Sequence, residues 1–153
     1  MKDSPNKMDP WIIAKLGKNI ENWQNVMSNV SIREGVMISH FTMLSDWNWY
    51  RRRGGNNYQT ALQFLEGWLP MLAPITPHLA EEFWHRMGHK ELLAEFQLPD
   101  NIIQINKDMV LEYENYLHKV IDSSRNVKGL AKRHTDTKIT TMVIQTAPKW
   151  MYD

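Results

Sequence analysis

Residues 69–88 read LPMLAPITPHLAEEFWHRMG, and the prolines in this stretch decide how the chain folds. Proline lacks a backbone N–H and cannot continue a helix, but it fits the first position of a new one. Pro74 therefore ends one helix, while Thr76 and Pro77 begin the next at its N-cap and first positions. Gly88 predicts the end of this second helix. These local signals explain the stretch as a structural corner, without an active site.

The residues before the corner predict three helices. Asp9 and Pro10 are an N-cap acid and a proline at the first helical position, so residues 1–9 are expected to form a disordered lead. Apolar residues then recur every three or four positions, which is the spacing of one helix face. The first helix has its predicted inward face at Ile13, Leu16, Ile20, Trp23 and Met27. A third helix over 58–73 contains Pro70 and leads into the corner.

The second helix carries signals at both of its ends. Ser31 and Glu34 have the spacing of a capping box, in which each side chain satisfies the other's backbone N–H. Gly54 and Gly55 follow three arginines and predict the end of the helix. The inward residues of this helix are predicted to be Val36, Met37, Phe41, Leu44 and Trp47.

After the corner, the sequence predicts a loop over 89–105 and a long helix over about 107–132. The apolar stripe of the long helix is predicted at Val110, Tyr113, Leu117, Val120, Ile121, Ser124 and Val127. Residues 138–146 read KITTMVIQT, a short β-branched run typical of a strand. We therefore expect an all-α fold, a bundle of about five helices over residues 10–134, with a short C-terminal β-strand in residues 135–153.

The composition is that of an ordinary globular domain with unevenly placed charge. The 153 residues suffice for one domain with a core, and the absence of cysteine excludes disulfides and thiolate metal sites. No membrane span or signal peptide is visible, so a cytoplasmic location is expected. The net charge is +1, but Lys and Arg exceed Asp and Glu by eight to five in residues 1–53 and by six to two in residues 119–138, whereas residues 81–114 hold three against eight. Local basic patches suit an RNA-contacting module, or a domain whose acidic part packs on a basic neighbour.

Two basic clusters are candidates for contact with the phosphates of an RNA. The first is Arg51, Arg52 and Arg53 at the end of the second helix, and the second is Arg125, Lys128, Lys132 and Arg133 on the long helix. Their cationic groups bind phosphate oxygens, but they equally suit the negative end of a helix dipole or a solvated helix face. Trp47, close to the first cluster, is expected in the core rather than stacked on an RNA base.

No catalytic or metal site is predicted. Glu82 and His85 have the Glu-x-x-His spacing of di-iron bundles, but no second such pair occurs. His85 and His89 are four residues apart, yet His89 follows the predicted helix end at Gly88. The sequence has no Gly-x-Ser-x-Gly elbow and no glycine-rich phosphate loop. We therefore assign no catalytic residue, metal ligand or cofactor to this chain, and a metalloenzyme is the least favoured alternative.

The corner resembles the signature of the helical anticodon-binding domain of class I aminoacyl-tRNA synthetases for branched aliphatic amino acids. That pattern runs Leu-x-x-Leu-Ala-Pro-x-x-Pro-His-x-Ala-Glu-Glu-x-Trp, and every fixed position is met between Leu69 and Trp84. DPWIIAKL at 9–16, WNWYRRRGG at 47–55 and QTAPKWMYD at 145–153 are also similar to this domain, most closely to its archaeal leucyl type. The resemblance covers residues 9–152.

This resemblance implies a C-terminal, tRNA-binding helical domain of leucyl-tRNA synthetase that positions tRNA(Leu) for leucylation. The same domain of an isoleucyl or valyl enzyme, or a mainly structural module docking on the catalytic domain, are the alternatives. The chain departs from the family where Phe96, Leu98 and Pro99 replace the usual Trp-Pro, and it lacks the His-Ile-Gly-His and Lys-Met-Ser-Lys-Ser catalytic signatures. ATP and Mg²⁺ are therefore expected to act in the parent enzyme's catalytic domain, outside this chain.

Overall fold

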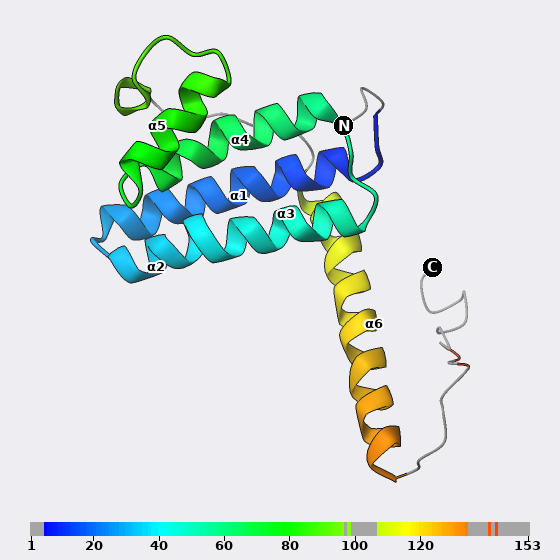
Figure 1. Cartoon of the computed structure of the whole chain (residues 1–153). Helices are drawn as coiled ribbons and strands as arrows, with labels where there is room; N and C mark the ends of the chain where they lie inside the picture. The colour runs from blue at the N-terminus through cyan, green and yellow to red at the C-terminus, as the bar shows by residue number, and fades with distance from the viewer. Residues whose placement is uncertain (1–4, 97, 99–106, 135–140, 142, 144–153) are drawn as a thin grey trace. The chain divides into compact units, whose positions relative to one another are not determined.

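The protein is represented by a computed structural model that describes residues 5–96, 98, 107–134, 141 and 143 (Figure 1). The described residues form helices and no strand, which confirms the all-α fold class. The elements are α1 (Asp9–Ser28), α2 (Ile32–Val36), the π-helix η1 (Met37–Thr42), α3 (Met43–Arg52), α4 (Tyr58–Leu72), α5 (Pro77–Arg86), the 3₁₀ turn η2 (Leu93–Glu95) and α6 (Lys107–His134). Because α2, η1 and α3 are continuous, they form one helical rod. The described residues therefore form five such rods (α1, α2–α3, α4, α5 and α6), the number expected. The strand predicted over 138–146 lies outside the described residues, apart from Thr141 and Val143.

Internal contacts divide the chain into two compact units, Met1–Glu112 and Tyr113–Asp153. The first unit holds α1 to α5 and the beginning of α6, and the second holds the rest of α6. The predicted limits of the bundle at residues 10 and 134 stay predictions.

The core of the first unit lies between α1, α3 and α4, which run side by side in Figure 1. Trp11 and Leu16 of α1 and Phe64 of α4 are at most 1% exposed. Trp47 of α3 is half-buried and stacks on the core residue Phe64, with 5.1 Å between the ring centroids. Removing this aromatic and aliphatic surface from water is the main favourable term in holding the helices together.

The carboxylate of Asp9 joins three segments at one end of the bundle. Its Oδ1 accepts a hydrogen bond of 2.7 Å from the hydroxyl of Tyr50, near the end of α3. Its Oδ2 accepts 2.8 Å and 2.7 Å bonds from Nδ2 of Asn57, which precedes α4, and from the backbone N–H of Asn6. Burial alone would raise the pKa of Asp9, but these hydrogen bonds favour the charged form and lower that pKa below its ordinary 3.8. Burial and the bond to Asp9 raise the pKa of Tyr50 to about 12.

The predicted disordered lead and the predicted N-cap both differ from the structure. Met8 is the N-cap and is only 5% exposed. Helix α1 therefore begins at Asp9, one residue before the predicted first position at Pro10. The side chain of Asn6 accepts from the backbone N–H of Met8 and so holds residues 6–8 in a turn. Asp9 does not cap its own helix, because the three donors described above already surround its carboxylate. Residues 1–4 lie outside the described part of the chain.

The inward face predicted for the second helix was largely wrong. Met37, Phe41 and Leu44 are 49%, 56% and 42% exposed. The residues that this rod buries are Gly35, Ser39, Met43, Asp46, Trp49 and Tyr50. The prediction looked only for large apolar side chains, whereas this rod buries the small or polar Gly35, Ser39 and Asp46 together with large ones.

Two contacts and a π-helix explain that choice of face. A Cβ placed on Gly35 would lie 2.4 Å from Sδ of Met27, so any other residue there requires the Met27 side chain to move. Asn19 of α1 donates a 2.8 Å hydrogen bond to Oδ2 of Asp46, which makes this buried carboxylate a tie between helices. Ser31 is the N-cap but its hydroxyl makes no capping bond, so the predicted capping box is absent. A π-helix follows, and its wider turn rotates later residues away from an α-helical stripe.

The corner after α4 is confirmed. Pro77 is the first residue of α5 and Thr76 is its N-cap, although the Thr76 hydroxyl donates back to the carbonyl of Leu72 (3.4 Å) and not into α5. The helix ends at Arg86, and Gly88 follows with φ of +99°, a conformation that favours glycine. A small apolar cluster fills the corner, made of Leu69, Ala80, Trp84 and Leu93.

Replacing Gly67 with alanine tests the contact between α1 and α4. The new Cβ would lie 2.9 Å and 3.0 Å from the Cδ atoms of Leu16 and 3.2 Å from that of Ile20. Overpacking costs about 1–3 kcal/mol and helix propensity returns at most ~1 kcal/mol, so urea denaturation should show a net loss. Gly129→Ala is the control, because a Cβ there meets nothing within 4 Å. A Gly67→Ala variant as stable as wild type would contradict the packing described.

The second prediction concerns the pH dependence that Asp9 gives to stability. Because its pKa is lowered in the folded state, Asp9 contributes stability above pH 3.8, and this contribution disappears as pH falls through the lowered value. Asp9→Asn places an amide against N–H donors and should cost about 1–3 kcal/mol at neutral pH, with a shallower loss between pH 4 and pH 2. Urea titrations at several pH values measure both. Glu34→Gln, at an exposed position of α2, is the control; if both variants behave alike, the Asp9 contacts do not stabilise the fold.

Candidate nucleic-acid interface

The arginine cluster at the end of α3 is divided between structural and exposed roles. Nη1 of Arg51 donates to the carbonyl of Gly55 (3.0 Å) and to Oδ1 of Asn56 (2.9 Å), so Arg51 closes the turn between α3 and α4. Gly54, with φ of +88°, provides the predicted helix end. One nitrogen of the Arg51 guanidinium is therefore committed to the turn, while the side chain as a whole is exposed.

Arg52 and Arg53 are both exposed at the same helix end. Arg52 forms no hydrogen bond or ion pair with any residue that the structure describes. Cations are favoured at the C-terminal end of a helix, where the dipole is negative. Because Trp49 and Tyr50 are only 8% and 0% exposed, the neighbouring aromatic rings cannot stack on RNA bases. Trp49 and Tyr50 therefore add no stacking surface to the charge that this site offers to a phosphate.

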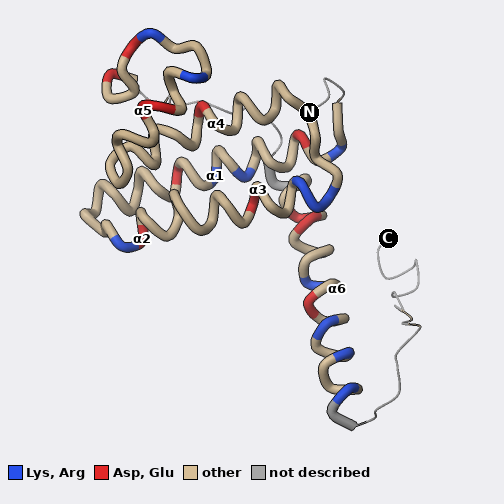
Figure 2. The backbone as a smooth tube through the Cα atoms, in the orientation of Figure 1, with Lys and Arg blue, Asp and Glu red and all other residues tan. Residues whose placement is uncertain are grey.

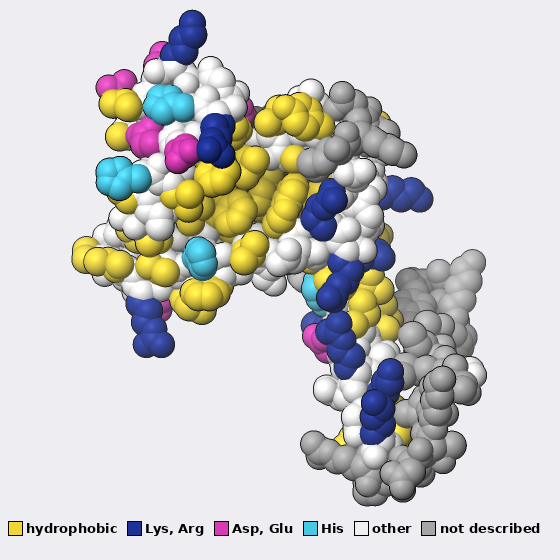
Figure 3. Space-filling view, in the orientation of Figure 1, with side chains coloured by type: hydrophobic (Ala, Val, Ile, Leu, Met, Phe, Trp, Pro, Cys, Tyr) yellow, Lys and Arg dark blue, Asp and Glu magenta, His cyan; other side chains and the backbone are white. Residues whose placement is uncertain are grey.

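The second cluster follows one side of α6. Arg125, Lys128 and Lys132 are exposed and are three and seven residues apart, a spacing that keeps them on one helix face. Figure 2 shows basic residues following one another in the C-terminal half of α6, and Figure 3 shows them as a column of side chains. Nη1 of Arg125 lies 3.2 Å from Oδ1 of Asp122, an exposed pair that leaves other guanidinium donors available. The side chain of Arg133 lies outside the described part.

Two tyrosines on α6 add an aromatic element that the sequence analysis missed. Tyr113 and Tyr116 are 69% and 61% exposed and are three residues apart. Tyr113 and Val127 had been assigned to the inward stripe of this helix, but Val127 is also 57% exposed. The two tyrosines could have been noticed in the sequence, because Tyr113, Tyr116 and Lys119 follow at intervals of three. Such a run places aromatic and basic groups together, as RNA-binding surfaces do.

The acidic and histidine residues of the corner serve the fold. Glu82 forms an exposed ion pair with Arg86 (2.6 Å), four residues later in α5. Glu81 accepts hydrogen bonds from the backbone N–H groups of Leu93 (2.9 Å) and Ala94 (3.2 Å), and thereby anchors the loop. Among the described residues, no group of three or more His, Cys, Asp or Glu is placed to hold a metal ion. Nor does any described helix have the length and apolar character to span a membrane.

Comparison with known proteins indicates the same family as the motif at residues 69–84. Residues 9–143 match the family described as anticodon-binding domain of tRNA ligase. Leucine–tRNA ligases from Methanococcus maripaludis (strain C7) and Methanocaldococcus jannaschii are each 29% identical over 147 residues, which are 95% of this chain and 15% of theirs. The enzyme of Methanosarcina acetivorans is 30% identical over 144 residues, 94% of this chain and 14% of its own length. The chain thus spans about 15% of the length of these relatives. No solved structure matches it.

Substituting Arg51 and Arg52 separately tests their different roles. Arg51→Gln should lower the free energy of unfolding by about 1 kcal/mol, because it leaves the Gly55 carbonyl and the Asn56 side chain without their donor. Arg52→Gln, one residue away and exposed, is the matched control and should change stability by less than ~0.5 kcal/mol. Urea denaturation of both variants provides the comparison. Equal losses would show that Arg51 has no special part in the turn.

Proposed function

The chain belongs to the family of anticodon-binding domains of tRNA ligases, and we propose that it is the tRNA-binding part of a leucine–tRNA ligase. In this role it holds tRNA(Leu) in place while a catalytic domain outside this chain attaches leucine with ATP and Mg²⁺. The relatives are leucine–tRNA ligases from several archaea, which supports leucine over isoleucine or valine. A cytoplasmic location stays a prediction.

The observation that carries the proposal is the exposed basic face of α6, which we define as Arg125, Lys128 and Lys132. These side chains stand in water on one side of a 28-residue helix, where they can reach successive phosphates of a folded RNA. Phosphate contacts of this kind position a nucleic acid and supply most of the affinity, but they carry no sequence information. Arg52 and Arg53 at the end of α3, and Arg133, are additional candidates. Arg51 contributes less, since its guanidinium closes the turn.

Binding by charge requires no chemistry at the surface. No group of three or more potential metal ligands occurs among the described residues, and we assign no catalytic residue to this chain. ATP, Mg²⁺ and leucine are substrates or cofactors of the longer enzyme, and their sites are expected in its other domains.

The second candidate function is a structural module that docks on the catalytic domain and touches tRNA little. The exposed Met37, Phe41 and Leu44 support it, because they lie on one side of the α2–α3 rod at intervals of four and three residues. Figure 3 shows apolar side chains gathered on the visible face of the first unit. Loss of tRNA affinity in basic-face variants would favour the first function, and unchanged affinity would favour this one.

The salt dependence of tRNA binding tests the proposed function. Each phosphate contact contributes about −0.7 to −0.9 to the slope of log K against log[salt]. Lys128→Gln with Lys132→Gln should therefore make the slope shallower by roughly 1.5 and weaken binding at low salt. Filter binding of tRNA(Leu) to the 153-residue chain measures both quantities. Lys18→Gln, an exposed lysine of α1, is the control. A double variant with the wild-type slope would remove the basic face from the interface.

A further inference from the structure

The exposed large apolar side chains that the structure describes on α6 lie on one line along the helix. They are 53% to 69% exposed, and they are Met109, Tyr113, Tyr116, Val127 and Leu130. Val120 and Ser123 lie between them on the same line. Together these residues are called the α6 seam below. Figure 1 shows α6 as one unbroken helix, so the seam belongs to a single element.

The spacing of the α6 seam is that of a coiled coil. From Met109 to Leu130, successive seam residues are alternately four and three positions apart, which is a strict heptad repeat. The a positions of this repeat are Tyr113, Val120 and Val127, and the d positions are Met109, Tyr116, Ser123 and Leu130. A helix that covers a globular core has a broader apolar stripe, whereas a narrow a/d seam over about three heptads fits into the holes of a second long helix.

The charge along α6 identifies a second copy of α6 as a suitable partner. Residues 107–120 hold two lysines against three Asp and Glu, and residues 121–134 hold four Lys and Arg against one Asp. In an antiparallel pair, the acidic half of each helix lies beside the basic half of the other, and the two helix dipoles oppose each other. A parallel pair would place the two basic halves side by side. The antiparallel arrangement is self-complementary, as a two-fold interface requires.

The sizes of the seam side chains also suit an antiparallel pair. In such a pair, the a positions of one helix lie opposite the d positions of the other. Tyr113 then faces Leu130 of the second copy, and Tyr116 faces Val127. Val120 faces Ser123 at the middle of the helix. Each large ring meets a smaller aliphatic side chain, so the layers fill without overlap.

We propose that the chain forms an antiparallel dimer through the α6 seam. Removing the exposed tyrosine and aliphatic surfaces from water supplies the favourable free energy. Arg125 and Lys132 occupy f positions, on the side of α6 opposite the seam, and therefore stay in water in the dimer. The proposed dimer thus does not depend on the proposed tRNA binding, and it leaves most of the basic face accessible.

Sedimentation velocity of the 153-residue chain, freed of nucleic acid, tests the proposal. Over a series of protein concentrations, the sedimenting mass should rise from that of one chain to that of two. Tyr116→Glu and Val127→Lys each place an unpaired charge in the same layer, and each should raise the dissociation constant of the dimer at least about tenfold. Asn115→Glu, at an exposed position of α6 away from the seam, is the matched control and should dimerise as wild type does. Circular dichroism checks that each variant keeps its helices.

An equimolar mixture of the Tyr116→Glu and Val127→Lys variants should recover the dimer. Antiparallel packing sets the introduced carboxylate of one chain against the introduced ammonium of the other, and the second layer of this kind keeps its wild-type pair. A parallel pair would bring neither combination together, so a mixture that stays monomeric overturns the antiparallel dimer.

A wild-type chain with the mass of one chain at every concentration also overturns the proposal, and would indicate that the seam packs within its own chain. Single variants that dimerise as wild type does overturn it too. Because these experiments contain no RNA, their failure leaves the proposed tRNA binding intact. Equally, tRNA binding without salt dependence would refute the basic face and leave the dimer.

Discussion

The carboxylate of Asp9 is the contact on which the arrangement of the first unit depends. It is bonded to Tyr50 and Asn57, which are 41 and 48 residues away in the sequence, and to the turn before its own helix. The Tyr50 hydroxyl also accepts from the backbone N–H of Asn57 (3.2 Å), so its donor and its acceptor are both used. One charged group thus fixes where α1 begins, where α3 ends and where α4 begins. The turn that carries Arg51 and Arg52 is positioned as a consequence.

The helices and their ends could be predicted from the sequence because their signals are local. Proline at positions 74 and 77, and glycine at positions 54 and 88, act through their own backbone geometry, and the structure agrees at each. The buried face of the second helix could not be predicted in the same way. Gly35 is buried because Met27 is close, and Asp46 because Asn19 reaches it, and neither contact leaves a periodic trace in the sequence.

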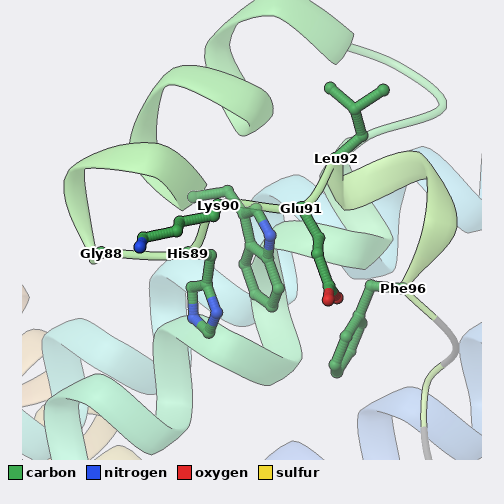
Figure 4. A pocket seen from close by; sticks show the side chains of 7 residues that line it. Gly88, His89, Lys90, Glu91, Leu92 and Phe96 are labelled. Carbon is green, nitrogen blue, oxygen red and sulfur yellow. The ribbon is translucent and has the colours of Figure 1, made fainter.

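The same division applies to the candidate site. The spacing of Arg125, Lys128 and Lys132 is a property of one helix, so their common face was predictable. The structural role of Arg51 depends on a turn whose shape only the folded chain shows. The pocket beside Trp84, a cavity of about 380 Å³ at the end of α5 (Figure 4), could not be predicted from the sequence. The loop that forms it is held by Glu81, which bonds the backbone N–H groups of Leu93 and Ala94, twelve and thirteen positions later. No local signal around Glu81 indicates which loop its carboxylate anchors.

The departure of this chain from its family pattern falls on the wall of that pocket. Phe96 is among the residues that stand where the family usually has Trp-Pro, and its ring is smaller than an indole. A larger ring packed against Trp84 would occupy more of the space that the pocket now provides. The smaller ring of Phe96 therefore leaves space beside Trp84 at the point where this chain departs from its family pattern.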